Sequence, residues 1–215
     1  MDYRLNLPWC VDTYRKYIKK EDKVVIIAFS YKEEEIQNLE QWNTYYQKPD
    51  GLYYRGMIDS FMAFGVQESN IRVINYFTDQ RETILSELAS SNILYLPGGM
   101  PTLLQARLKE FKLVEAIQKY QGVVIGCSAG AMVQFDAYYI SPDYEYPNYS
   151  EEEGLGLLSG FAVEAHYHKD SPAQNEAIKK YQDKYHLKIY GIGDEGLIVI
   201  NNHQIQCYGD VTLFE

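Results

Sequence analysis

The sequence predicts an α/β fold, a three-layer sandwich in which helices cover both faces of a mostly parallel central sheet. Short apolar runs alternate with segments of helical spacing in the order β-α-β-α-β-α-β-α, which is typical of parallel sheets. The chain has 215 residues, of which 46% are hydrophobic and 23% charged. This length and composition predict one soluble domain spanning 1–215.

The alternating elements occupy the first half of the chain. Its β-branched apolar runs predict strands at 23–30, 71–76, 92–96 and from Val123 onward. Helical spacing predicts helices within 33–64, 80–90 and 102–120. Lys48-Pro49-Asp50-Gly51 breaks the first helical region into two pieces. The 22 residues before the first strand are interpreted as an added edge strand.

The second half predicts a different arrangement. A Tyr-rich segment at 138–153 is interpreted as a loop, either half-exposed surface or the wall of a substrate cleft. A strand at 160–168 follows, and then a helix at 171–185 that opens with Ser171 as cap and Pro172 at the first position. The tail predicts strands at 188–192, 196–200 and 204–208, the last two forming an antiparallel hairpin around Asn201-Asn202.

Composition excludes several function classes. The net charge of −10 argues against partners such as nucleic acid or a membrane surface, because both require a basic footprint. No apolar run approaches the roughly 20 residues that span a bilayer, and no secretory signal pattern opens the chain. Cys10, Cys127 and Cys207 are odd in number and scattered, which favours reduced thiols in the cytoplasm over disulfides or zinc. We expect no metal and no cofactor.

The run at 122–131 predicts a buried strand that turns sharply into a helix, with Ser128 at the turn. In a G-x-S-x-G pattern, small residues two positions before and after the serine permit a strained turn that exposes its hydroxyl. The N–H of Ala129 is then available to an oxyanion. Gly98 and Gly99 follow a neighbouring strand and would add backbone N–H groups at the same edge of the sheet.

A serine nucleophile needs a base, and four histidines are candidates. His186 lies at the end of a predicted helix and His203 at a polar hairpin turn, so both are interpreted as surface residues. His166 and His168 close an apolar strand, and one of them is predicted to be the base.

The base needs a carboxylate to fix its tautomer. Gly191-Ile192-Gly193-Asp194-Glu195-Gly196 places two carboxylates in what we interpret as a glycine-flanked turn at a strand end. Glu195 is favoured over Asp194, and Asp143, 15 residues after Ser128, is a rival.

These residues carry a family resemblance over roughly residues 23–200. The segments G-C-S-A-G-A at 126–131, P-G-G at 97–99, A-H-Y at 165–167 and D-E-G at 194–196 resemble, in order and spacing, the aspartyl dipeptidase and cyanophycinase family of serine peptidases. The resemblance implies a flavodoxin-like fold akin to class I glutamine amidotransferases and a Ser-His-Glu triad. By resemblance, Ser128 is the nucleophile, His166 the base and Glu195 the acid, with Gly99 and Ala129 as the oxyanion hole. It implies a small peptide or isopeptide as substrate.

The chain departs from the family pattern at several positions. Met100 and Pro101 follow the two glycines where a polar residue is usual, and Ala165 replaces a proline before the histidine. Family members that accept acidic substrates use basic groups after the histidine. In this chain Lys169 is the only lysine or arginine shortly after His166. These departures disfavour a preference for an N-terminal aspartate.

Two other functions stay open. An amidotransferase-like hydrolase would use Cys127, but this register puts Ile125 and Ala129 at the positions where the turn favours glycine. A non-enzymatic member of the fold would bind a ligand through the Tyr-rich segment. A homo-oligomer is compatible with either function.

Overall fold

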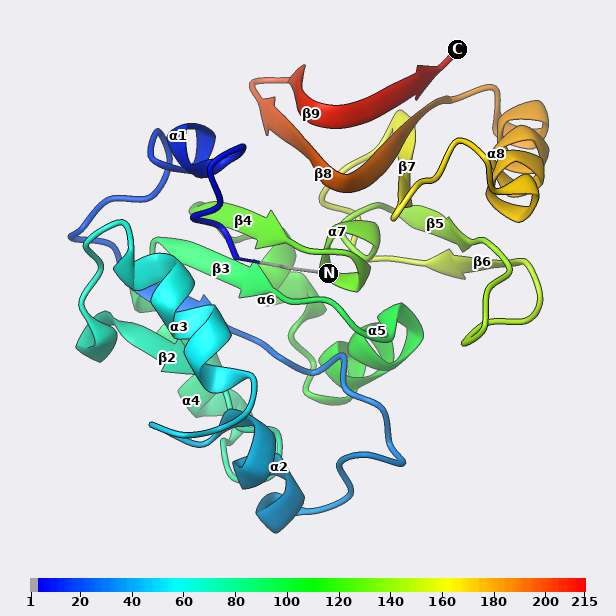
Figure 1. The fold of residues 1–215 in the computed structure, drawn as a ribbon. Coiled ribbons are helices and arrows are strands. Elements are labelled where there is room, and N and C mark those ends of the chain that lie inside the picture. Colours follow the sequence, from blue (N-terminus) through cyan, green and yellow to red (C-terminus); the bar gives the residue numbers. More distant parts are fainter. Residues whose placement is uncertain (1–3) are drawn as a thin grey trace. The chain divides into compact units, whose positions relative to one another are not determined.

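The computed structural model describes residues 4–215, which form two compact units, one up to Ala131 and one from Met132 to Glu215 (Figure 1). The single domain stays a prediction. The fold is mixed α/β, with an all-parallel four-stranded sheet flanked by helices and a further sheet in the C-terminal part, as predicted. Within residues 4–215, no helix combines the length and apolar character needed to span a membrane.

The sheet of the first unit has the strand order β2-β1-β3-β4, and all its neighbours run parallel. Its strands are β1 (Val24–Ile26), β2 (Ile71–Val73), β3 (Ile93–Leu96) and β4 (Val123–Gly126). All residues of β1 and β3 are buried, as expected for central strands covered on both faces. The chain therefore brings the carboxyl ends of β1, β3 and β4 to one edge.

Helices connect these strands and cover both faces of the sheet. They are α2 (Leu39–Tyr46), α3 (Tyr54–Met62), the 3-10 helix η1 (Glu68–Asn70), α4 (Arg81–Ser90), α5 (Pro101–Glu110), α6 (Val114–Gln118) and α7 (Ala129–Met132). Figure 1 shows α3 in front of the sheet and α4 and α6 behind it. Right-handed crossovers explain why α3 lies on one face and α4 and α6 lie on the other. The connection from β1 to β2, which contains α3, runs one way across the sheet. The connections from β2 to β3 and from β3 to β4, which contain α4 and α6, run the other way.

Two expectations for this unit are wrong. The region before the first strand contains a short helix, α1 (Val11–Tyr14), and no strand between residues 4 and 22. Its Cys10 is buried with its thiol directed to the carbonyl oxygen of Leu5, so this segment packs through side chains instead of pairing at a sheet edge. The helical region at 102–120 is two helices, because Lys112 adopts a left-handed φ of 54° between α5 and α6.

The second unit contains a two-stranded and a three-stranded sheet. Its strands are β5 (Ala137–Ile140), β6 (Ser150–Glu153), β7 (Phe161–Ala165), β8 (Lys188–Asn201) and β9 (Gln204–Phe214). Strands β5 and β6 pair antiparallel, β7 pairs parallel with β8, and β8 pairs antiparallel with β9. The antiparallel hairpin at the C-terminus is therefore confirmed. Helix α8 (Pro172–Tyr185) begins as predicted, with Ser171 Oγ accepting from Gln174 N at 3.4 Å.

The Tyr-rich segment is not a loop throughout, because its ends form β5 and β6. Tyr138 and Tyr139 are buried in β5 and are not half-exposed surface, whereas Tyr144 in the connecting loop is fully exposed. The ring of Tyr139 lies 4.6 Å from that of Tyr181 on α8. Tyr139 and Tyr181 therefore form part of the core of the second unit, together with Ala162, Ala177, Ile178 and Ile189.

The Gly193-Asp194-Glu195 segment lies inside a strand and not in a turn. Strand β8 continues from Lys188 to Asn201, and its register against β9 shifts between Ile192 and Gly196. Residues 193–195 face only Asp210, so the strand bulges there. The predicted hairpin is also shifted by one residue: Asn202 and His203 form the two-residue loop, with left-handed φ angles of 49° and 63°.

Candidate active site

Ser128 lies at a tight turn between β4 and α7. Its φ is 50°, an uncommon backbone conformation for a residue with a side chain. Gly130 N bonds to the Cys127 carbonyl oxygen at 2.9 Å, and a Cβ at Gly130 would overlap the carbonyl oxygen of Leu96 at the end of β3. The second glycine of the motif is thus required by close packing against β3. The sharp strand-to-helix turn at Ser128 is therefore present, and its role in holding a nucleophile stays a prediction.

The predicted oxyanion segment lies beside Ser128 in the same unit. A Cβ at Gly98 would stand 3.2 Å from Ser128 Cβ, so the two turns are nearly in contact. Gly99 has a φ of 132°, and a Cβ there would overlap the carbonyl oxygen of Ser30. Position 99 therefore requires glycine on two grounds, its backbone angle and the space around it.

Ser30, which the sequence did not single out, holds this segment in place. Its hydroxyl donates to the Gly98 carbonyl oxygen at 2.5 Å, and its own carbonyl oxygen accepts from Met100 N at 2.7 Å. The side chain is buried. The loop after β1 and the loop after β3 are thus joined on both sides of Gly99, which fixes the direction of the backbone there.

Arg107 on α5 anchors the same loop from the other side. This buried guanidinium donates through Nη1 to the carbonyl oxygens of Phe29 at 2.6 Å and Tyr31 at 2.7 Å, the two neighbours of Ser30. It also lies 3.8 Å from the centroid of the Tyr31 ring, and Nη2 is 3.8 Å from Glu33 Oε1. A single arginine in a helix carries no sequence signal for this role, because the partners are backbone atoms far away in sequence.

Cys127 precedes the serine but is poorly suited to act as a nucleophile. Burial raises the pKa of its thiol to about 12, so the reactive thiolate is scarce at neutral pH. Its backbone N donates to the Leu96 carbonyl oxygen at 3.0 Å, which ties the turn to β3. We therefore interpret Cys127 as a packing residue and not as a nucleophile.

In the second unit, the structure brings His166 and Asp194 together. The Nδ1 of His166 lies 3.4 Å from Asp194 Oδ1, and both side chains are part-exposed. His166 follows the last residue of β7 and has a φ of 53°, so it is held in the left-handed region as Ser128 is. The β8 bulge puts Asp194 beside the end of the parallel neighbour β7, which explains how this contact arises.

The other predicted residues of this unit have different surroundings. Glu195 is exposed and has no hydrogen bond or ion pair to another residue within 4–215. Asp143 is engaged locally, since its Oδ1 accepts from the backbone N atoms of Glu145 and Tyr146 at 2.8 and 2.6 Å. His168 bonds through its backbone N to Gln174 Oε1 at 2.9 Å. The helix end at His186 and the hairpin turn at His203 agree with the sequence interpretation.

Glu164, two residues before His166, is a buried carboxyl that the sequence did not single out. Burial raises its pKa to about 7, and the polar side chains around the carboxyl group only partly oppose this effect. The Ser141 hydroxyl donates to Glu164 Oε2 at 2.8 Å. An acidic residue in an apolar strand is a sequence signal that could have identified it.

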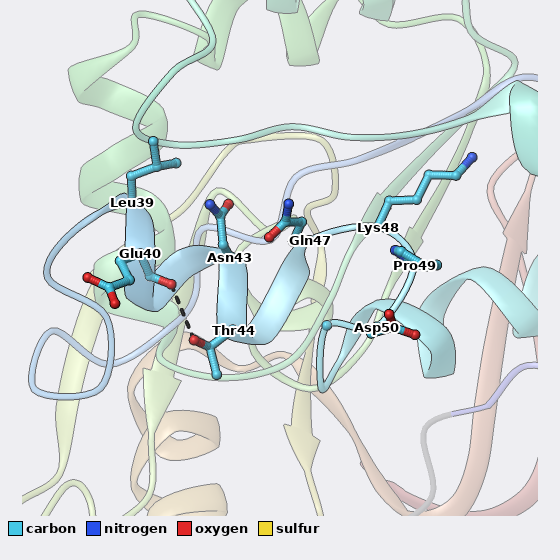
Figure 2. Close-up of a pocket in the computed structure, with 9 residues that line it drawn as sticks. Leu39, Glu40, Asn43, Thr44, Gln47, Lys48, Pro49 and Asp50 are labelled. Atoms are coloured by element: carbon cyan, nitrogen blue, oxygen red, sulfur yellow. Dashed lines mark hydrogen bonds between the residues drawn. The ribbon is translucent and has the colours of Figure 1, made fainter.

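Neither a cluster of metal ligands nor the surface hollow along α2 coincides with the predicted catalytic residues of 4–215. Within residues 4–215, no group of three or more His, Cys, Asp or Glu side chains is placed to hold a metal ion. Figure 2 shows a hollow along α2 and the loop that follows it, where Asn43 and Gln47 point to the same side of the helix and the Thr44 hydroxyl donates to the Glu40 carbonyl oxygen at 3.2 Å. None of the predicted catalytic residues lines it.

Comparisons with known proteins identify the family and the fold. The model of peptidase family S51 matches residues 53–208, which include Ser128, His166 and Asp194. Two solved structures show the same fold. A candidate peptidase E protein from Listeria monocytogenes EGD-e has a TM-score of 0.65 at 17% identity, covering 91% of each chain. A peptidase from an acI-B1 Actinobacterium has a TM-score of 0.60 at 18% identity, covering 97% of this chain and 82% of its own. The comparison with curated proteins gave no significant match.

Proposed function

The chain belongs to peptidase family S51, a family of serine peptidases, and from this premise we propose that it hydrolyses short peptides or isopeptides through an acyl-enzyme. The observation that carries the proposal is the turn at Ser128, whose left-handed φ and close approach to β3 present a serine at the carboxyl edge of a parallel sheet. The runner-up nucleophile, Cys127, is disfavoured by its raised thiol pKa.

In the proposed reaction, Ser128 Oγ attacks the carbonyl carbon of the scissile amide and gives its proton to His166. The tetrahedral oxyanion accepts hydrogen bonds from the N–H groups of Gly99 and Ala129. The C–N bond then breaks, and the imidazolium returns the proton to the departing amine. Water, deprotonated by His166, hydrolyses the ester and releases the acid product with Ser128 restored.

The carboxylate that orients His166 is one of two neighbours. Glu195 is the residue that the family resemblance implies, and Asp194 is supported by its distance of 3.4 Å from His166 Nδ1. A carboxylate at Nδ1 fixes the tautomer that leaves Nε2 free to accept the serine proton. Asp194→Asn and Glu195→Gln, compared in one assay, distinguish them, because losing the orienting carboxylate costs orders of magnitude in kcat whereas losing its neighbour does not.

The substrate side of the site lacks features that would select acidic side chains. Met100 replaces a polar residue after the glycines, and within the loop between β7 and α8 Lys169 is the only lysine or arginine. We therefore propose that the protein accepts short peptides without requiring an N-terminal aspartate.

The proposal is tested with a library of dipeptides and acyl-peptides together with labelling by a serine-directed fluorophosphonate. We expect wild type to turn over a subset of the library and to be labelled at Ser128, and Ser128→Ala to lose both properties while remaining folded. Ser90→Ala, which removes a hydroxyl at the exposed end of α4, is the matched control and should behave as wild type. Undiminished hydrolysis by Ser128→Ala would rule out this mechanism.

A further inference from the structure

The loop between β7 and α8 holds His166 in an uncommon backbone conformation. A residue with a side chain at a φ of 53° relaxes toward negative φ unless its surroundings prevent it. The base of a serine peptidase must keep one orientation, because small displacements of a catalytic group cost large factors in rate. Contacts that fix the backbone at His166 therefore bear directly on the proposed reaction.

Gln174 supplies several such contacts from a single side chain. Its Nε2 donates to the carbonyl oxygen of His166 at 3.0 Å and to that of Ala165 at 3.4 Å. Its Oε1 accepts from the backbone N of His168 at 2.9 Å. The amide thus bonds to the carbonyl oxygen of His166 and to the backbone N of His168. A change of the His166 backbone toward negative φ would break these bonds.

Gln174 stands at a helix position where its side chain would ordinarily bond to the start of its own helix. Ser171 caps α8 and Gln174 follows three residues later, which is the spacing of a capping box. In a capping box the glutamine side chain would return to the backbone N of the cap residue. Here that backbone N donates instead to the His168 carbonyl oxygen at 2.9 Å, and the Gln174 amide extends to the loop before the helix.

A buried carboxyl group lies next to this amide. Glu164 is on β7 two residues before His166, and its side chain is near that of Gln174. Ser141 donates to the same carboxyl group at 2.8 Å. The Gln174 amide therefore faces β7, while α8 holds its backbone.

We infer that Gln174 is a positioning residue for the reaction, holding the His166 backbone in its left-handed conformation so that the imidazole stays directed at its carboxylate partner. The inference rests on the proposed role of His166 as base. Gln174 lies on α8, and its effect on the reaction passes through the backbone of residues 165–168.

The test compares Gln174→Met, which keeps side-chain length without the amide, with Gln182→Met as matched control. Gln182 lies on the same helix and donates to the Leu187 carbonyl oxygen at 3.4 Å, at the opposite end of α8. The full-length protein is labelled with isotopic histidine, and the imidazole signals are followed by NMR. The rate of fluorophosphonate labelling at Ser128 is measured in the same samples.

In Gln174→Met we expect the His166 imidazole signal to shift and to lose its response to Asp194→Asn, while the signals of His186 and His203 stay in place. Labelling should slow about 10- to 100-fold. Gln182→Met should leave the His166 signal and the labelling rate within twofold of wild type. If Gln174→Met does not fold, Gln174→Asn, shorter by one methylene group, is used, with the same expectation.

An unchanged His166 signal and labelling rate in a folded Gln174 variant would overturn the inference. The proposed function fails separately, if wild type is not labelled at Ser128 at all. In that case a shifted His166 signal in Gln174→Met would still establish the positioning contact.

Discussion

Replacing Glu164 by glutamine should change how the stability of the second unit depends on pH. The Glu164 carboxyl is 5% exposed, and burial raises its pKa from 4.5 to about 7. Ser141 donates a hydrogen bond to it at 2.8 Å, and the negative charge of Asp143 adds to the effect of burial. Glutamine has nearly the same shape and cannot ionise, so the substitution removes the titration with little change in packing.

The sign follows from proton binding. Between pH 4.5 and about 7 the folded protein keeps the Glu164 proton while the unfolded chain has lost it. Stability therefore falls as pH rises through this window and becomes constant, with respect to this group, above about pH 7. At about 1.4 kcal/mol per pH unit over roughly 2.5 units, the loss is about 3 kcal/mol for wild type and zero for Glu164→Gln.

Hydrogen exchange resolved by peptide is the suitable assay, because both tryptophans, Trp9 and Trp42, lie in the first unit and do not report on the second. Protection of the β7 and β8 amides is measured from pH 5 to 8 after correction for the intrinsic exchange rate. Glu176→Gln, which removes an exposed carboxylate on α8, is the control and should reproduce the wild-type dependence. Parallel pH dependences for wild type and Glu164→Gln would refute the reasoning.

Three further predictions concern the first unit. Gly99→Ala should slow fluorophosphonate labelling at least 100-fold, since its φ of 132° and the Ser30 carbonyl oxygen exclude a Cβ; wild-type labelling would contradict the oxyanion role. Arg107→Met should lower the free energy of unfolding by about 3 kcal/mol in urea titrations followed by tryptophan fluorescence, because it leaves two buried carbonyl oxygens unpaired. Arg72→Met, which breaks a part-exposed ion pair, should cost less than about 1 kcal/mol in the same titration, and equal losses would argue against the Arg107 anchor. Cys127→Ala should retain peptide hydrolysis within about threefold, as expected for a thiol whose pKa of about 12 keeps it protonated; loss of activity would reopen the cysteine mechanism.

The parallel half of the fold could be predicted because its signals are local. The apolar runs that become β1, β3 and β4 are short, β-branched and bounded by turn residues, so each predicts its own strand without reference to the others. The break in the helical region at 102–120 could not be predicted, because only the left-handed φ at Lys112 separates α5 from α6 and the spacing continues through it.

The turn at Ser128 could be predicted because the residues that constrain it lie within one short motif. The small residues around Ser128 predict the sharp turn, and the structure places Gly130 against the Leu96 carbonyl oxygen as that motif requires. The choice of carboxylate was not predictable in the same way. Asp194 and Glu195 are adjacent in sequence, and which of them faces His166 depends on a bulge that appears only when β8 pairs with β9.

The sequence by itself determined the parallel α/β arrangement, the serine turn at 126–131 and the family to which the motifs point, because each strand, turn and motif is encoded by residues within a few positions of one another. Only the tertiary structure decided that Ser30 and Arg107 fix the segment around Gly99 and that Gln174 holds the backbone of His166. In each case a side chain bonds to backbone atoms of another loop. A backbone carbonyl or N–H is present at nearly every position, so no residue pattern identifies which one a distant side chain will meet.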